Sequence, residues 1–188
     1  GVYDAMNKGI KVASGDIIGI LNSDDFYPNY SILSQIVQEF ERTNCDCLYG
    51  DLVYVDKANA RNIVRYWKSG LFSLSKIHNG WMLPHPTLFV KKKIYNKFGL
   101  YNTSLSRAAD YEMIIRLLKK HKISIKYLPK ILVKMRAGGL SNSSFLNRIK
   151  ANQEDSSAWR INNLYPPLLI RFLKPIRKIK QFFLRPNR

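Results

Sequence analysis

A short apolar run that ends in adjacent carboxylates constrains this chain more than any other feature. The run is Ile17-Ile18-Gly19-Ile20-Leu21, and Asn22-Ser23-Asp24-Asp25 follows it directly. An apolar run of this length predicts a strand buried on both faces, as in a parallel sheet, where ligands bind at the carboxyl ends of the strands. Neighbouring carboxylates repel each other unless a cation lies between them, so a divalent metal carrying a phosphate group is one interpretation. The alternative is that Asp24 and Asp25 only form a turn and cap the following helix.

Helical and strand-like segments alternate along the first part of the chain. Apolar spacing predicts helices over 2–13 and 32–40, and strand-like residues recur at 47–55. This order is that of a βαβ unit and predicts an α/β fold. Within the later strand, Gly50 predicts a bulge or a close approach of another backbone. The Asp51 side chain either faces the site or is solvated, and we expect the solvated position.

Three polar residues farther along are candidates for a site. His85 lies between two prolines, which predicts an extended conformation suited either to a ligand contact or to a buried structural role. Asp110 falls at the start of a predicted helix over 108–118, as an ordinary N-terminal acid or as a fixed general base. Arg136 ends the second of two predicted strands, over 123–127 and 131–135, and precedes paired glycines. It could grip a phosphate or simply enter a glycine turn.

The charge balance predicts an anionic partner. The chain has 31 basic and 13 acidic residues and a net charge of +18, which suits nucleic acid, nucleotide phosphates or an anionic membrane surface. Much of the excess lies in the tail over 168–188, where an apolar stripe with basic flanks predicts an amphipathic helix lying on an anionic bilayer, or else one docked on the core. Two cysteines argue against a disulfide scaffold or a zinc site, and no signal peptide or membrane-spanning run is evident, so we expect a reduced, cytoplasmic protein.

Several segments, taken in order, resemble family 2 glycosyltransferases with the GT-A fold, of the bacterial type that builds surface polysaccharides. No single motif carries the resemblance, which covers residues 1–144. The segments are Tyr3-Asp4-Ala5-Met6-Asn7-Lys8-Gly9-Ile10, Ala13-Ser14-Gly15-Asp16, Leu21-Asn22-Ser23-Asp24-Asp25, His85-Pro86-Thr87, Ala109-Asp110-Tyr111-Glu112, Arg116-Leu117 and Arg136-Ala137-Gly138-Gly139-Leu140-Ser141.

The resemblance implies a GT-A-like (Rossmann-like) α/β fold, with a mixed sheet flanked by helices. Family members begin with a βαβ unit that binds the nucleoside, and this chain starts after it. We therefore expect an N-terminally incomplete domain over 1–144, with weak or absent activity on its own. Residues 145–188 are expected to form a C-terminal helical region whose basic amphipathic tail associates with a membrane.

The resemblance also implies an inverting sugar transfer from a nucleotide-diphosphate donor to a glycan or lipid-linked acceptor, peripherally at the inner face of the cell membrane. Asp110 would be the catalytic base, and Asp24 and Asp25 would hold Mg²⁺ or Mn²⁺, with Asn22 standing where the family often has Asp. Implied substrate contacts are Asp4, Asn7, Asn22, Trp81, His85 and Arg136. The alternatives are a basic nucleic-acid- or membrane-binding module and an inactive truncated glycosyltransferase. No nucleic-acid-binding motif is recognised, and no nucleic-acid partner is expected.

Overall fold

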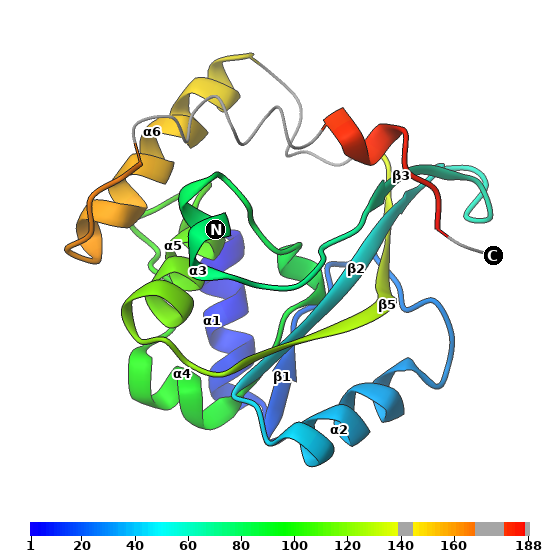
Figure 1. Cartoon of the computed structure of the whole chain (residues 1–188), viewed down its shortest axis with the longest axis horizontal. Coiled ribbons are helices and arrows are strands. Elements are labelled where there is room, and N and C mark those ends of the chain that lie inside the picture. Colours follow the sequence, from blue (N-terminus) through cyan, green and yellow to red (C-terminus); the bar gives the residue numbers. More distant parts are fainter. Residues whose placement is uncertain (139–144, 168–178, 187–188) are drawn as a thin grey trace.

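A five-stranded mixed sheet organises the chain in the computed structural model, which describes residues 1–138, 145–167 and 179–186 (Figure 1). The sheet order is β1-β4-β2-β3. The fifth strand, β5, lies off this path and pairs with β2 along the whole length of β2. The strands are β1 (Ile17–Gly19), β2 (Cys47–Val55), β3 (Ile63–Trp67), β4 (Phe89–Lys91) and β5 (Ile125–Arg136).

Helices cover both faces of this sheet (Figure 1). One face packs against α2 (Ile32–Thr43), which confirms the helix predicted after Pro28. The opposite face carries a larger apolar cluster to which the remaining α-helices contribute. These are α1 (Val2–Val12), α3 (Leu74–His78), α4 (Lys92–Phe98), α5 (Ala109–Ile114), which continues as a π-helical segment η2 (Ile115–Lys120), and α6 (Phe145–Ile161). A 3₁₀ turn, η1, spans His85–Thr87, so His85 begins a turn and the predicted extended conformation is wrong.

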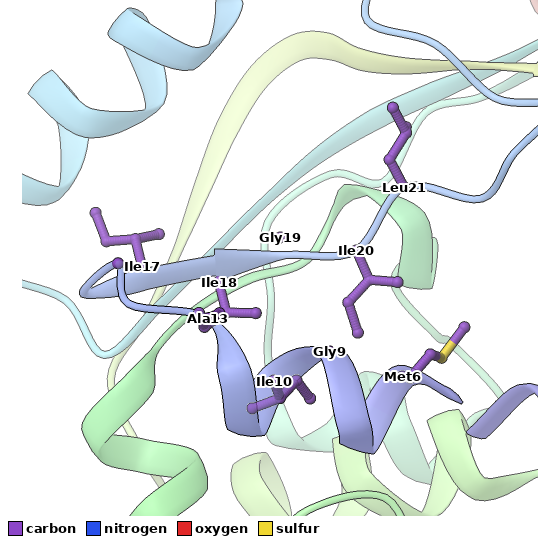
Figure 2. Close-up of a pocket in the computed structure, with 10 residues that line it drawn as sticks. Met6, Gly9, Ile10, Ala13, Ile17, Ile18, Gly19, Ile20 and Leu21 are labelled. Atoms are coloured by element: carbon purple, nitrogen blue, oxygen red, sulfur yellow. The ribbon is translucent and has the colours of Figure 1, made fainter. Parts of the chain in front are cut away.

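The apolar run that precedes the acids forms β1, but its neighbour is not a parallel strand. β1 pairs antiparallel with β4, which in turn pairs antiparallel with β2. Figure 2 shows Ile18 and Ile20 directed toward α1, and Ile17 and Leu21 directed to the other side. The prediction of a strand buried on both faces is therefore met only in part: Ile18 is buried and Ile17 is half-buried, but Leu21, just beyond β1, is 37% exposed. Among the described residues, no strand pairs with the other edge of β1.

The direction of the strands decides which residues meet. β1 is antiparallel to β4, β4 is antiparallel to β2, and β2 is parallel to β5, so β1, β2 and β5 all point the same way. Their carboxyl ends consequently share one edge of the fold. The segment containing Asp24 and Asp25 leaves β1 at that edge, where β5 ends in Arg136.

Gly50 allows a close approach between β2 and β5. A Cβ atom on Gly50 would lie 2.4 Å from Leu132 Cγ and 2.8 Å from the Lys130 carbonyl oxygen, and the pairing register shifts there, which confirms the predicted bulge. The two strands predicted over 123–127 and 131–135 are one continuous strand. Pro129 does not end it because the bulge absorbs the lost backbone donor.

The C-terminal residues contact the sheet at one point among those described. In the 3₁₀ turn η4 (Lys180–Phe182), the Gln181 side-chain carbonyl accepts a hydrogen bond of 2.8 Å from Arg65 Nε on β3. Most of the predicted amphipathic tail, residues 168–178, lies outside the described residues. No helix that the structure describes has both the length and the apolar character needed to cross a membrane.

Candidate active site

The acid pair at the end of β1 includes a buried oxygen that has no partner. Asp24 is exposed, whereas Asp25 is only 7% exposed. Asn22 Nδ2 donates a hydrogen bond of 2.8 Å to Asp25 Oδ2, and Asp25 Oδ1 is buried without a hydrogen-bond partner. Burial raises the pKa of Asp25, the bond from Asn22 opposes this, and the charge of Asp24 adds to the rise. A buried acceptor without a donor costs about 1–3 kcal/mol, so this atom is suited to a ligand.

The acid pair lies beside the end of β5. Backbone hydrogen bonds of 3.0 and 2.9 Å join Phe26 and Lys134 in both directions. The Arg136 guanidinium lies 5.2 Å from the centre of the Phe26 ring and donates a hydrogen bond of 3.2 Å to the Lys57 carbonyl. The structure thus brings Arg136 next to the acid-bearing segment. Residues 139–141 of its motif lie outside the described residues.

The pair alone would have to supply the protein ligands of a cation at this edge. Among the described residues, no three His, Cys, Asp or Glu side chains gather in a metal-binding group. Mg²⁺ is commonly held by one or two carboxylates together with substrate phosphates and water. The exposed carboxylate of Asp24 and the partner-free Oδ1 of Asp25 fit that mode of binding.

Asp110 lies at the start of α5, among aromatic side chains. The Tyr3 hydroxyl donates a hydrogen bond of 3.1 Å to Asp110 Oδ1, and the Tyr3 ring stacks on Tyr101 with 5.7 Å between centroids. The Tyr101 hydroxyl in turn shares a hydrogen bond of 2.6 Å with His85 Nε2. Tyr3, Tyr101, His85 and Asp110 therefore form one polar cluster inside an apolar setting.

Burial is the main cause of the shifted pKa values of Tyr3 and His85 in this cluster. Burial raises the pKa of Tyr3, and the Asp110 carboxylate raises it further, so the Tyr3 hydroxyl stays protonated and can act as a donor. Burial lowers the pKa of His85, an effect that the charge of Asp110 partly offsets. The His85 imidazole is therefore neutral at neutral pH.

Asp4, Asn7 and Trp81, which the sequence suggested as substrate contacts, have partners within the protein. Asp4 lies on an exposed face and pairs with Lys8 at 2.9 Å. Asn7 donates to and accepts from the backbone of Tyr101, both at 2.9 Å, which fixes α1 against that loop. Trp81 is 8% exposed, and its indole N–H donates a hydrogen bond of 2.9 Å to the Ser69 carbonyl. The geometry gives each of these residues a structural contact.

Asp51 is buried, contrary to the solvated position predicted. It is 2% exposed and accepts hydrogen bonds from the Tyr66 hydroxyl at 2.6 Å, the Tyr127 hydroxyl at 2.8 Å and the Ser69 backbone N–H at 2.8 Å. These donors come from β3, β5 and the loop after β3. Asp51 therefore ties the sheet together, and no local pattern in the sequence indicates it.

The acid pair and the Asp110 cluster lie toward the same end of the fold. α1 turns back directly into β1, and Figure 2 places Met6 beside Ile20 and Ile10 beside Ile18. The beginning of α1, which carries Tyr3, therefore lies toward the carboxyl end of β1, where Asn22 follows. The fold thus brings a carboxylate pair at a strand end and a separate carboxylate at a helix start toward one end of a mixed α/β sheet, which is the arrangement expected from the resemblance to glycosyltransferases.

Comparison with known proteins specifies the family. Residues 1–114 match the model of glycosyl transferase family 2, and the chain belongs to that family. A PGL/p-HBAD biosynthesis glycosyltransferase of Mycobacterium bovis is 28% identical over 155 residues, covering 79% of this chain and 58% of the relative. An uncharacterized glycosyltransferase of Methanocaldococcus jannaschii is 28% identical over 149 residues, covering 77% of this chain and 49% of the relative. The chain thus spans about half the length of these relatives.

Solved structures agree on the fold. The S. aureus TarS 1–349 structure in complex with UDP-GlcNAc aligns with a TM-score of 0.57 at 15% identity, covering 83% of this chain and 44% of that fragment. A second structure of TarS 1–349 aligns with a TM-score of 0.56, also at 15% identity, over 86% of this chain and 44% of the fragment. At this identity the likeness concerns the fold. It confirms the predicted GT-A-type architecture.

Proposed function

We propose that the chain contributes the metal- and acceptor-side half of an inverting glycosyltransferase that uses a nucleotide-diphosphate sugar. The observation that carries this proposal is the buried, partner-free Oδ1 of Asp25, next to the exposed Asp24 at the carboxyl end of β1. An unpaired carboxylate oxygen at this position favours a cation that binds a diphosphate. Binding of UDP-GlcNAc by TarS, which shares the fold, supports a nucleotide-sugar donor.

Asp110 is the proposed general base. The Tyr3 hydroxyl donates to Oδ1, which leaves Oδ2 to accept the proton of an acceptor hydroxyl as that oxygen attacks the anomeric carbon. Attack from the face opposite the leaving diphosphate inverts the configuration at that carbon. His85, neutral and hydrogen-bonded to Tyr101, is a proposed acceptor contact beside the base.

Asp24 and Asp25 would hold Mg²⁺ or Mn²⁺. When bound, such a cation neutralises the charge that develops on the leaving diphosphate. Asn22 orients Asp25 through its hydrogen bond to Oδ2 and so presents Oδ1. Arg136, beside Phe26, is a proposed contact for a phosphate oxygen because its guanidinium donors are only partly used by the Lys57 carbonyl.

The direct test is sugar transfer by the full-length gene product that contains this chain. With Mn²⁺, we expect release of nucleoside diphosphate from a nucleotide sugar to depend on an added glycan or lipid-linked acceptor, and EDTA to abolish it. The measurement is the rate of diphosphate release over a panel of donors, with NMR of the product linkage. Undiminished turnover in EDTA would contradict the metal, and a product that retains the donor's anomeric configuration would contradict inversion.

We also propose that the protein acts at an anionic membrane surface, where a lipid-linked acceptor and surface-polysaccharide synthesis would be located. The net charge of +18 supports this. So do the apolar side chains near the C-terminus that the sheet leaves uncovered, since Ile179 is 56%, Phe182 53% and Phe183 81% exposed. Basic and apolar side chains together are what binds an interfacial segment to anionic lipid.

Phe183→Ser should weaken binding to anionic vesicles by roughly 10- to 100-fold, because inserting an aromatic side chain contributes about 1.5–3 kcal/mol and each 1.4 kcal/mol is tenfold. Co-sedimentation with vesicles containing phosphatidylglycerol measures this, and binding should decrease as salt rises. Leu71→Ser is the matched control, since Leu71 is 70% exposed but lies in the loop between β3 and α3. Equal losses for the two variants, or equal binding to neutral vesicles, would argue against the membrane role.

A further inference from the structure

Glu154, on α6, holds the loop that leads into α5. Its Oε1 accepts a hydrogen bond of 2.7 Å from the Ser106 hydroxyl. Its Oε2 accepts the backbone N–H groups of Arg107 at 2.7 Å and Ala108 at 3.0 Å. A carboxylate that receives three donors is strongly constrained, because charge-assisted hydrogen bonds are roughly twice as strong as neutral ones. The constrained segment ends two residues before Asp110.

One further side chain of α6, and one from the residue directly after it, hold the residues that follow Asp110. Trp159 Nε1 donates a hydrogen bond of 3.0 Å to the Tyr111 hydroxyl, and Asn162 Nδ2 donates one of 2.9 Å to Glu112 Oε1. Both donors are buried, Trp159 at 0% and Asn162 at 2% exposed. α6 therefore contacts the chain on both sides of Asp110, although some 46 residues or more separate the partners in sequence.

The start of α5 needs support from outside. Its N-cap residue is Ala108, which has no polar side chain, and no side-chain cap bond is formed there. In many helices a Glu or Gln at the third helical position accepts the N–H of the N-cap residue, but in α5 that position is Tyr111. Here the Glu154 carboxylate receives the Ala108 N–H instead. Burial and Asp110 are the main causes that raise the pKa of Tyr3, but the charge of Glu154 adds to them, which also places it near the cluster.

We propose that Glu154 is a positioning residue that sets the geometry of Asp110 by clamping residues 106–108. This inference rests on the proposed function, in which Asp110 is the base. α6 lies beyond residues 1–114, which match the family model, and within the region that the sequence suggested as a separate C-terminal part. The inference assigns α6 to the catalytic unit. A shift of about 1 Å in a catalytic group can reduce a rate by as much as about 100-fold, so such a clamp has a measurable effect.

The test is a double-mutant cycle in the full-length gene product. Glu154→Ala should lower kcat by about 10–100-fold and leave the KM for the donor unchanged, because the donor contacts proposed above, Asp24, Asp25 and Arg136, lie outside this loop. Glu154→Gln retains one carbonyl acceptor and should lose less. In an Asp110→Asn background, Glu154→Ala should cause almost no further loss, since a positioning residue cannot act on an absent base.

Gln153→Ala is the matched control, because Gln153 is the exposed neighbour on the same helix and should behave as wild type. Hydrogen exchange supplies a readout that does not depend on turnover: the amides of Arg107 and Ala108 should exchange faster in Glu154→Ala and not in Gln153→Ala. A loss of the same factor with and without Asp110, or unchanged exchange, would overturn the proposal. If Asp110→Asn itself transfers sugar normally, it is the proposed base that fails, which is a distinct outcome.

Discussion

Asp110→Asn should reduce kcat for sugar transfer by about 10²–10⁴-fold, the usual contribution of a general base. Asparagine keeps the size of the side chain and can still accept the Tyr3 hydroxyl hydrogen bond, but it cannot take a proton. The fold and the acid pair should be unaffected, so the dissociation constant for the donor in the presence of Mn²⁺ should stay within about twofold, judged against the ±0.5 kcal/mol typical of neutral changes.

Steady-state kinetics of the full-length gene product, with donor affinity from calorimetry, separate these quantities. Glu41→Gln is the control: it removes a carboxylate of the same charge from the exposed face of α2. Equal loss of kcat and of donor affinity would point to a structural role for Asp110, and an unchanged kcat would remove it from the mechanism.

Replacing both Asp24 and Asp25 by alanine should abolish the stabilisation that Mn²⁺ and UDP together give the protein. At a ligand concentration of about 100 times Kd, binding stabilises the folded state by about 2.7 kcal/mol. For a domain of this size, about 1 kcal/mol raises Tm by roughly 2–4 °C. The wild type should therefore gain roughly 5–10 °C and the double variant close to none, and transfer should fall in parallel by at least about 100-fold.

A milder substitution distinguishes a metal ligand from a turn residue. Asp25→Asn removes the charge but keeps the shape, so without metal it should raise stability by about 1 kcal/mol, because an uncharged amide costs less than a carboxylate to bury at the partner-free position of Oδ1. When Mn²⁺ and UDP are present, the variant should no longer be more stable than the wild type, because only the wild type keeps both carboxylates to bind the cation. Asp16→Asn, an exposed carboxylate at the other end of β1, is the control and should retain the Mn²⁺ effect. Loss of stability in Asp25→Asn without metal would favour a turn-forming role.

Local patterns predicted most elements because their signals are short in range. The helical spacing over 2–13 and the strand over 47–55 were both correct, as was the bulge at Gly50. The two strands predicted over 123–127 and 131–135 proved to be one, β5, because the residues between them lie where the pairing with β2 shifts register and does not end. The position predicted for Asp51 was wrong: its burial depends on Tyr66, Tyr127 and Ser69, and Tyr127 lies 76 residues away.

The candidate site shows the same division. The sequence could single out Asp24, Asp25 and Asp110, because each lies at a position where functional carboxylates are common, at the end of an apolar run or at a helix start. Their hydrogen-bond partners could not be predicted. Tyr3 is 107 residues from Asp110, and Glu154 is 46 residues from Ala108, so only the folded chain brings these side chains together.

By itself, the sequence determined where the acids stand relative to β1, because the change from an apolar run to polar residues marks the place where the strand ends. It also determined the order of helices and strands and the resemblance that leads to the family. Only the tertiary structure decided that β1 pairs antiparallel with β4 and that Asp25 keeps one oxygen without a partner. It alone placed Tyr3 and α6 around Asp110. Hydrophobic periodicity records which face of a segment is buried, whereas hydrogen-bond partners from distant segments are set by how the buried faces pack together.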